Sequence, residues 1–463
     1  MTKLTTTDQE PPWRLHWRDL HSFENFPGMI VNTIVETGSL GAVYYNAGPE
    51  VGVFKPAGRL LLLFVGLAIT CAALAAHAED VATVDDNPAL TLRLETRLRY
   101  VYIDQRDKPD RVDVTTARAI IGADLMLSPR LKVALELIHS DFVPPKRYND
   151  DPAAFTSPYP LLPDPRHTGV NEAHVTWTPT PDWLMRLGRQ RMVIGNERHL
   201  GDDSFRQVPQ LYDGLSVRGS PMSGAQLTFG QFNRLRTRFG PTEPLQLTVL
   251  ELAANPLPDM GVSAYALRHR RPRADSDLSY YGVAELANWV VGAALDGSHP
   301  LGELRGYYTL NAALQRSTGN QSILRANYWR AGAGIGWHGL IARVDHEVKG
   351  SNGGRYGFQT PLTNQYAFNG NALTFFDTPT TGLRDTWATL RWEQGRWSAL
   401  GEYHWFRSDH GGLRYGREFD ANVTYTINPR AYLRAQWARY RLFAGGFGAD
   451  IDKVWLTVGY EIK

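Results

Sequence analysis

The chain has 463 residues, of which 43% are hydrophobic and 11% aromatic, and its formal net charge is +2 at pH 7. The mean hydropathy of −0.33 excludes a bundle of transmembrane helices, and the absence of a basic run argues against nucleic-acid binding. A single cysteine excludes a disulfide framework. The aromatic content and the 43 Gly are typical of a large β protein.

One stretch, residues 60–76, is continuously apolar. It follows Lys55 and Arg59, and it ends at an A-x-A motif, residues 76–78, that precedes acidic residues. This layout is typical of a secretory signal peptide. The alternative is an uncleaved anchor helix, but the run is at the short limit for spanning a bilayer.

The leader divides the chain into three parts. We expect residues 1–52 to be an unstructured or mis-assigned N-terminal extension, 53–78 to be a cleaved signal peptide, and 79–463 to be one exported domain. Cys71 lies within the leader. The exported chain would then lack cysteine, so a continuous hydrogen-bonded sheet must stabilise it.

Beyond the leader, short segments alternate strictly between apolar and polar residues. In residues 90–104, Leu92 and Leu98 fall on one face of a strand. Arg93 and Arg97 fall on the other. A period of two means that one face meets an apolar environment and the other meets water. The pattern recurs to the C-terminus in about 18 segments, and 16 remain a possible count.

Short and long connections also alternate along the chain. The short ones include residues 128–130, 178–182, 220–224 and 428–430, and the long ones include 143–168, 195–211, 234–244 and 444–450. Outer-membrane barrels have this asymmetry, with tight periplasmic turns at one end and long external loops at the other. We therefore predict an all-β fold, a transmembrane antiparallel barrel in the outer membrane of a Gram-negative bacterium.

The inward faces of the predicted strands are rich in arginine. The cations expected to line the pore are Arg93, Arg97, Arg99, Arg118, Lys132, Arg343, Arg391 and Arg434. Rings of Arg or Lys are how pores favour anions. Carboxylates lie near each of them in the sequence, so the alternative is a charge lattice that only fills the interior.

Arg189 is also counted as pore-lining, although its position is less regular. Arg189 and Arg191 share a parity with Leu187, so strict alternation would turn them to lipid. A charge there would cost about 2–4 kcal/mol near the bilayer midplane. Either a bulge around Gly188 redirects them or they lie at the rim.

Two blocks of the sequence resemble a known family. The first comprises Gly188, Arg189, Gln190, Arg198, Gly201, Arg206, Gln207, Asp213 and Gly214, and the second comprises Pro361, Asn369, Gly370, Pro379, Gly382 and Asp385. Together they resemble the signature of the alginate export family of outer-membrane barrels. Phe205 is a departure, because the family pattern usually has Trp there.

The resemblance implies an 18-stranded, monomeric channel that exports an alginate-like anionic polysaccharide through an Arg-rich pore, with a periplasmic partner as a further expectation. A general or substrate-specific anion or sugar porin is the alternative, and an outer-membrane enzyme or adhesin is the second. We expect no enzymatic activity, cofactor or metal. Glu197, Asp202 and Asp203 could hold Ca²⁺, but such clusters are more often solvated.

Overall fold

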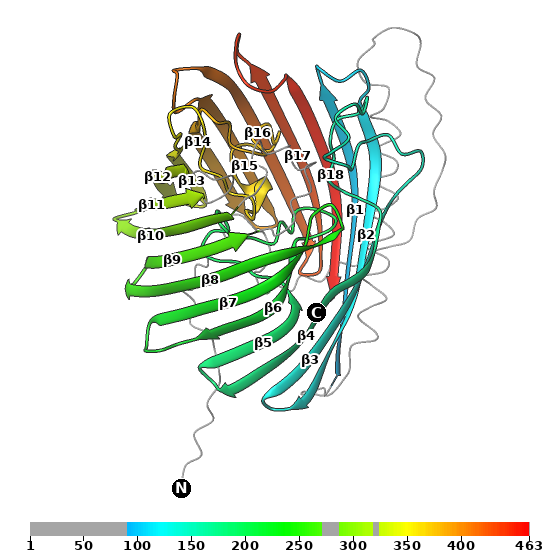
Figure 1. Ribbon diagram of the computed structural model, residues 1–463, viewed down its shortest axis with the longest axis vertical. Coiled ribbons are helices and arrows are strands. Elements are labelled where there is room, and N and C mark those ends of the chain that lie inside the picture. The colour runs from blue at the N-terminus through cyan, green and yellow to red at the C-terminus, as the bar shows by residue number, and fades with distance from the viewer. Residues whose placement is uncertain (1–89, 271–286, 318–323, 463) are drawn as a thin grey trace.

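The protein is a closed antiparallel β-barrel. The structure, a computed structural model, describes residues 90–270, 287–317 and 324–462. Its 18 strands form one sheet that closes where β1 pairs with β18 (Figure 1). The prediction of an all-β barrel with about 18 strands is confirmed. The expected extension, residues 1–52, and signal peptide, residues 53–78, lie outside the described residues.

Eighteen strands and one short helix make up the described chain. The strands are β1 Leu90–Gln105, β2 Val112–Ser128, β3 Leu131–Phe142, β4 His167–Thr180, β5 Trp183–Gln190, β6 Leu211–Gly219, β7 Ala225–Arg236, β8 Thr242–Leu257, β9 Met260–Arg270, β10 Ala287–Leu301, β11 Leu304–Ser317, β12 Leu324–Trp337, β13 Leu340–Lys349, β14 Leu383–Gln394, β15 Trp397–Arg407, β16 Arg414–Asn428, β17 Ala431–Leu442 and β18 Ile451–Ile462. The 3₁₀-helix η3 is Gln365–Ala367. Within the described ranges, no helix is long and apolar enough to cross a membrane.

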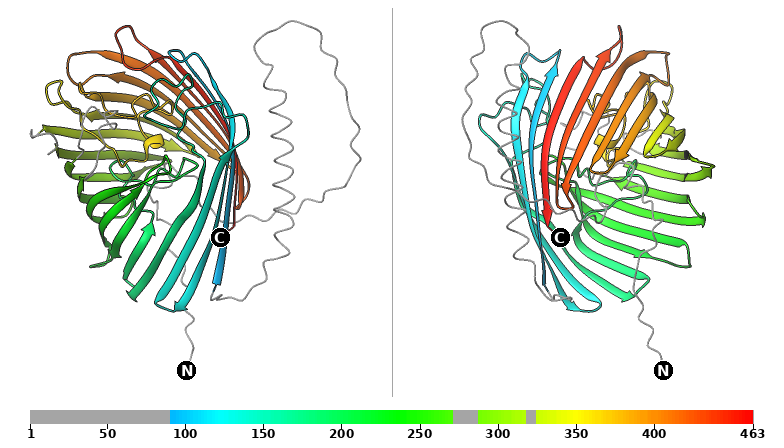
Figure 2. Two further views of the ribbon diagram at one scale, coloured as in Figure 1. Left: turned by 45° about the vertical axis from the view of Figure 1, so that its right-hand side comes forward. Right: turned by 180° about the vertical axis from the view of Figure 1, so that it is seen from behind.

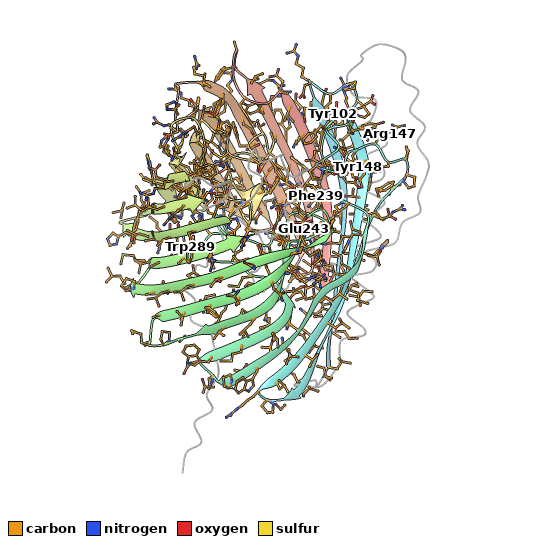
Figure 3. The ribbon with its side chains drawn as sticks, viewed as in Figure 1. Tyr102, Arg147, Tyr148, Phe239, Glu243 and Trp289 are labelled. Carbon is orange, nitrogen blue, oxygen red and sulfur yellow. The ribbon has the colours of Figure 1, made fainter. Side chains whose placement is uncertain are left out.

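The alternation of the sequence produces an apolar outer surface. Leu92, Leu310 and Val344 are 66%, 52% and 59% exposed on the outside of the barrel. Trp177, Trp337 and Trp397 lie near the short turns, and Trp405 lies near the other end. Trp289, labelled in Figure 3, also lies near that other end. An apolar band between aromatic girdles is the surface that suits a bilayer.

The connections separate by length between the two ends of the barrel, as predicted. Among the described residues, the connections at one end, such as 129–130 and 395–396, are tight turns. The other end carries loops, of which residues 143–166, 191–210 and 350–382 are the longest. We refer to these as the turn end and the loop end.

Two predicted boundaries were wrong. The long connection expected over residues 195–211 already begins at Arg191, because β5 ends at Gln190 and Arg191 forms ion pairs with Glu172 and Asp202 inside the barrel. The connection expected over residues 234–244 is shorter, since β7 extends to Arg236 and β8 begins at Thr242.

The long loops fold into the barrel instead of projecting from it (Figure 2). In loop 191–210, Met192, Ile194 and Leu200 are buried against one side of the wall. In loop 350–382, Phe358 joins the same cluster. Phe375, from the same loop, packs in a second cluster that includes Trp455 of β18. Burial of apolar surface therefore holds the loops against two regions of the wall.

The outer surface gives the first testable prediction. Leu310 lies in the middle of β11 and points outward. Replacing it with Arg places a guanidinium near the bilayer midplane, which should destabilise the folded protein by about 2–4 kcal/mol. Urea unfolding in lipid vesicles measures this change, with Leu310→Met as the control. Equal stability of the two variants would mean that this surface does not face lipid.

Candidate functional site

Loops 191–210 and 350–382 are joined directly inside the barrel. The amide of Gly201 donates to the carbonyl of Leu362 at 2.8 Å, and the amide of Asn364 donates to the carbonyl of Glu197 at 3.1 Å. A Cβ atom on Gly201 would lie 2.8 Å from the Asn364 nitrogen. Only glycine permits this approach, which explains the residue in backbone terms.

A buried ion pair connects the same loop to the wall. Arg198, 2% exposed, donates to Glu347 of β13 at 2.6 Å and to Asn369 at 2.8 Å. Asn369 in turn donates to Glu347 at 2.7 Å and to Asp385 of β14 at 3.1 Å. The two signature blocks of the sequence therefore meet here, and their polar residues fix the loops to each other.

Three of the arginines predicted to line the pore hold the opposite side of loop 191–210. Arg97 of β1 donates to the carbonyls of Ser204 and Phe205 at 3.0 and 3.1 Å. Arg118 of β2 donates to the carbonyl of Arg206 at 3.0 Å. Arg99 lies over the Phe205 ring, with its guanidinium carbon 4.1 Å from the centroid. These side chains face inward as predicted, but they stabilise backbone and ring atoms of the loop.

Phe205 lies where the two loops and the wall meet. Its ring is stacked on Tyr366 with centroids 3.4 Å apart, and it contacts Trp455 edge-on at 6.0 Å. Gln207, two residues further on, donates from its side chain to Thr116 at 2.9 Å and from its backbone amide to Asp164 at 3.1 Å. The loop is thus held along its length.

Loops 191–210 and 350–382 meet inside the barrel, and we call this contact the crossing. A cavity of about 290 Å³ lies below the crossing, toward the turn end. Its lining consists of Arg93, Asp124, Lys132, Glu172, His174, Arg186, Arg191, Val193 and Arg218. We call it the turn-side cavity, because Lys132 is two residues from the turn at 129–130 and Arg218 is the penultimate residue of β6. Five cationic side chains face two carboxylates there. Glu136 and Asp202, outside the lining, pair with Arg93 and Arg191, so a net positive charge of one remains.

The cations of the turn-side cavity differ in their partners. Arg93 pairs with Asp124 at 2.7 Å and with Glu136 at 2.9 Å. Lys132 pairs with Asp124 at 3.0 Å. Arg186 donates to the Thr176 hydroxyl at 3.4 Å, and it forms no ion pair within the described ranges. A solute carboxylate can therefore approach Arg186 without displacing a protein carboxylate.

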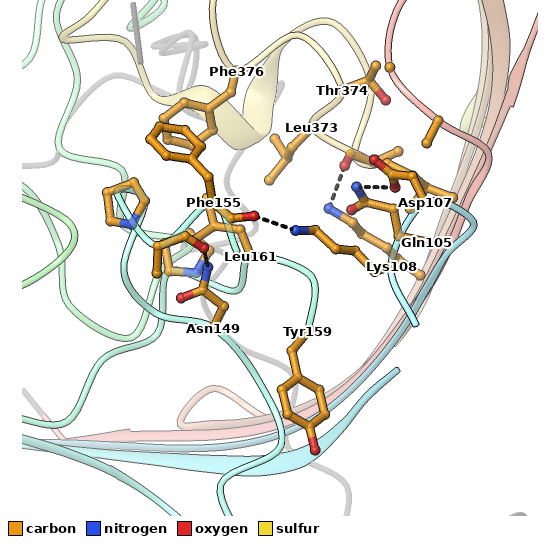
Figure 4. A pocket seen from close by; sticks show the side chains of 18 of the residues that line it. Gln105, Asp107, Lys108, Asn149, Phe155, Tyr159, Leu161, Leu373, Thr374 and Phe376 are labelled. Carbon is orange, nitrogen blue, oxygen red and sulfur yellow. Dashed lines mark hydrogen bonds between the residues drawn. The ribbon is translucent and has the colours of Figure 1, made fainter. Parts of the chain in front are cut away.

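A second cavity, of about 260 Å³, lies toward the loop end (Figure 4). Phe155, Leu373 and Phe376 give it an apolar side, and Lys108 donates to the Phe155 carbonyl at 3.2 Å across it. Arg206 and Lys453 also line this space, which we call the loop-side cavity. Burial and the nearby guanidinium of Arg238 act against the charge of Arg206, and its pKa is lowered overall, with Asp203 opposing the shift.

Arg189 was wrongly counted as pore-lining. The strand pairing is regular through Ala173, Arg189 and Asp213, which share the outward face with Leu187. Arg189 donates to both carboxylate oxygens of Asp213, at 2.7 and 2.9 Å. It lies one residue from the end of β5, at the rim, where this paired charge is tolerated.

Three other predicted pore residues do face inward. Arg343 donates to Asp345 and to the Thr309 hydroxyl, and Arg391 pairs with Glu393. Arg434 donates to the Thr424 hydroxyl at 3.1 Å. Arg343 and Arg391 thus fit the alternative given in the sequence analysis, in which paired charges form a lattice that fills the interior.

The remaining motif residues shape the backbone. Gly188 has a φ of +128°, and a Cβ there would lie 2.2 Å from the Ala173 carbonyl oxygen. A Cβ on Gly370 would lie 2.5 Å from the Glu418 carboxylate. Gln190 donates to the carbonyl of Gly214 at 3.1 Å. Pro361, Pro379 and Gly382 lie in or at the end of loop 350–382, where the Gly382 amide donates to the Pro379 carbonyl at 2.8 Å.

The carboxylates considered for Ca²⁺ are used otherwise. Asp203 pairs with Arg238 at 2.6 Å, and Asp202 pairs with Arg191 at 3.3 Å. Glu197 accepts from Asn364 at 2.8 Å. Each of these carboxylates holds a different part of loop 191–210, and the three do not converge on one point.

The sequence analysis missed Arg186 and Arg218, and it left Arg191 open between redirection by a bulge and a position at the rim, whereas Arg191 lines the turn-side cavity. Alternation along β5 and β6 could have found the first two, because Leu187 and Leu215 are exposed outside and the even-numbered neighbours face inward. Arg191 could not be assigned in this way, since it lies beyond the end of β5.

His199 in loop 191–210 predicts a pH dependence of stability. Burial, and then the charge of Arg198, lower its pKa from 6.5 to about 3. The unfolded chain binds a proton below pH 6.5 and the folded one does not, so stability should fall as pH drops from 6.5 toward 3. The expected slope is about 1.4 kcal/mol per pH unit.

Chemical unfolding of the detergent-solubilised protein at several pH values measures this slope. The matched variant is His199→Gln, which keeps a hydrogen-bonding group near the Tyr265 hydroxyl, 2.9 Å from Nε2 in the parent. The variant should lose less stability on acidification. The same slope for both proteins would exclude His199 as the cause.

Comparison with solved structures supports this architecture. OccK9 (OpdG) of Pseudomonas aeruginosa superposes with a TM-score of 0.62 at 15% identity, covering 81% of this chain and 98% of that one. OpdK of P. aeruginosa, solved with vanillate, gives 0.60 at 14%, covering 80% and 98%. A BenF-like porin from Pseudomonas fluorescens Pf-5 gives 0.61 at 12%, covering 81% and 98%. The fold of this chain is that of outer-membrane porins.

No protein-family profile and no curated protein sequence matches the chain. The resemblance to the alginate export family therefore gains no support beyond the barrel architecture. The signature residues that suggested it are explained by the contacts between the inner loops and the wall.

Proposed function

We propose that this protein is a passive outer-membrane channel that admits small organic anions, and that the turn-side cavity binds their carboxylate groups during passage. The observation that carries the proposal is the lining of that cavity, in which five cationic side chains face two carboxylates. Arg binds carboxylates through two parallel N–H donors and keeps its charge when partly desolvated. Passage by diffusion needs neither bond chemistry nor a cofactor.

The crossing of the lumen favours small solutes over a polymer. Loop 191–210 is tied to loop 350–382 by backbone hydrogen bonds and to the wall by Arg97, Arg118 and Arg198. A polyuronate chain would have to displace these buried contacts, whereas a small anion can pass beside them. This argument supports the porin alternative of the sequence analysis over polysaccharide export.

The solved relatives point the same way. The OpdK structure was determined with vanillate, an aromatic carboxylate. In our protein, the loop-side cavity combines Phe155 and Phe376 with Lys108, Arg206 and Lys453, which suits an apolar ring with a negative group.

A closed sheet leaves no strand edge for pairing with another copy, so we propose that the barrel acts as a monomer in the membrane.

Swelling of proteoliposomes tests the proposal. Vesicles containing the protein are diluted into isosmotic benzoate, into arabinose, which is neutral and of similar size, and into oligomannuronate. Benzoate should enter fastest, arabinose more slowly, and the oligomer not measurably. Equal rates for benzoate and arabinose would refute anion preference, and rapid entry of the oligomer would restore the polysaccharide reading.

A further inference from the structure

A histidine on the inner wall lies among four carboxylates that belong to the lining of neither cavity. His404 of β15 is directly paired with Glu418 of β16, and Glu402 is directly paired with Asp420. Asp385 of β14 completes the group, because both of its carboxylate oxygens lie 3.0–3.1 Å from His404 Nδ1. The imidazole is 3% exposed and is sandwiched between the rings of Trp387 and Phe406.

The hydrogen bonds leave one nitrogen of this imidazole available. When Nδ1 donates to Asp385, the lone pair of a neutral ring is on Nε2. His404 Nε2 is buried without a hydrogen-bond partner. Oδ2 of Asp420 lies 3.7 Å from Nε2. Nε2 therefore faces Oδ2 of Asp420, which accepts from the Asn371 amide at 3.2 Å and has a further lone pair.

Glu402 supplies a third ligand at that position. One donor atom from each of Glu402, His404 and Asp420 lies within 4.8 Å of the others. Glu402 is only half-buried and accepts one hydrogen bond, from Thr389 at 2.9 Å, so its carboxylate can move inward. We propose that Glu402, His404 and Asp420 form a binding site for a divalent transition-metal ion such as Zn²⁺.

The surrounding charges fit a cation. Asp385 would orient the imidazole through Nδ1, as carboxylates commonly do for metal-bound histidines. Glu418 lies beside Asp420 and interacts with it directly. The cation facing both carboxylates is Lys453, whose ammonium group donates to the Ala372 carbonyl. Nitrogen and carboxylate donors together favour Zn²⁺ over Ca²⁺ or Mg²⁺, which prefer oxygen ligands alone.

Metal binding would act on loop 350–382. The Asn371 amide donates to Asp420 at 3.2 Å, and the Ala372 amide donates to Glu418 at 2.5 Å. The carboxylates that would face the ion therefore also hold this loop to the wall. Loading the site should raise the thermal unfolding temperature, because a ligand that binds only the folded state stabilises it.

Isothermal titration of the EDTA-treated, full-length protein in detergent with Zn²⁺ tests the site, with Ca²⁺ as the competing probe. One Zn²⁺ per chain should bind, without comparable Ca²⁺ binding. Glu402→Gln and His404→Gln should abolish this binding, and Asp385→Asn should weaken it by about 10–100-fold. His346→Gln, on the neighbouring strand β13 and outside the cluster, is the control and should bind as the parent does.

The alternative arrangement is a protonated imidazole shared between Asp385 and Asp420. With this arrangement, Zn²⁺ should show no saturable binding at neutral pH. Any Zn²⁺ that does bind should bind elsewhere, so Glu402→Gln and His404→Gln would leave the binding unchanged. Either result would overturn the proposal. Glu402 is at the partly exposed edge of the cluster, so Glu402→Gln keeps the test valid if replacement of His404 prevents folding. The test is independent of whether the channel prefers anions.

Discussion

Replacement of Arg198 by Gln is expected to destabilise the protein by about 3–5 kcal/mol and to increase single-channel conductance. Arg198 is buried, pairs with Glu347 at 2.6 Å and lies 4.5 Å from the Phe368 ring centroid. Removing one partner leaves the Glu347 charge buried and uncompensated, which is the costly way to break such a pair. Loop 191–210 then loses its strongest tie to β13.

The conductance change follows from the position of that tie. Arg198 belongs to the loop that crosses the barrel, so releasing it should let the loop move away from loop 350–382 and widen the path. Unfolding in urea measures the first effect, and single-channel recording in planar bilayers measures the second. A simultaneous change in both would identify the crossing as the constriction.

An exposed ion pair at the loop end provides the control. Arg384 pairs with Asp409 at 2.9 Å, but its side chain is 51% exposed. Arg384→Gln should therefore cost less than about 1 kcal/mol, and it should leave the conductance unchanged. If Arg198→Gln behaves in the same way as Arg384→Gln, the inner loops are not held as described.

The second large effect is expected in ion selectivity. Reversing Arg186 and Arg218 to Glu changes the turn-side cavity from five cations and two carboxylates to three cations and four carboxylates. Two charges about 4 Å apart in water interact by about 1 kcal/mol, so each reversed charge should change the anion-to-cation permeability ratio several-fold. The double variant should prefer cations where the parent prefers anions.

A charge reversal of the same kind outside the path serves as the comparison. Arg106 lies in the connection between β1 and β2, is 81% exposed and pairs with Asp450 at 3.3 Å. Arg106→Glu should alter selectivity far less, because surface charges beyond about 8–10 Å are screened at physiological salt. Reversal potentials under a salt gradient measure both variants. Equal shifts would show that the turn-side cavity is not on the ion path.

The barrel could be predicted from sequence because strand alternation is a local property. Leu92 and Arg93 reveal their faces through their immediate neighbours, and the alternation of short and long connections distinguishes the two ends of the barrel. The same rule places Arg189 outside, and the structure agrees, since Asp213 is directly paired with it. Counting Arg189 among the pore-lining residues was therefore wrong, and the position at the rim that the sequence analysis left open describes it.

The site could not be predicted in the same way because it depends on contacts between distant segments. Arg198 meets Glu347 across 149 positions of the sequence, and no local pattern indicates this pair. Inward parity also does not distinguish arginines that hold a loop, such as Arg97 and Arg118, from one that faces a cavity, such as Arg186. That distinction requires knowing where loop 191–210 lies.

The most direct test of the account is the reversal potential of the unmodified protein in a planar bilayer that separates two KCl concentrations. An anion-preferring channel should give a potential of the sign set by chloride, and added benzoate should reduce the chloride current by competing for the turn-side cavity. A potential of the sign set by potassium, or a membrane that stays non-conducting after insertion, would contradict the account.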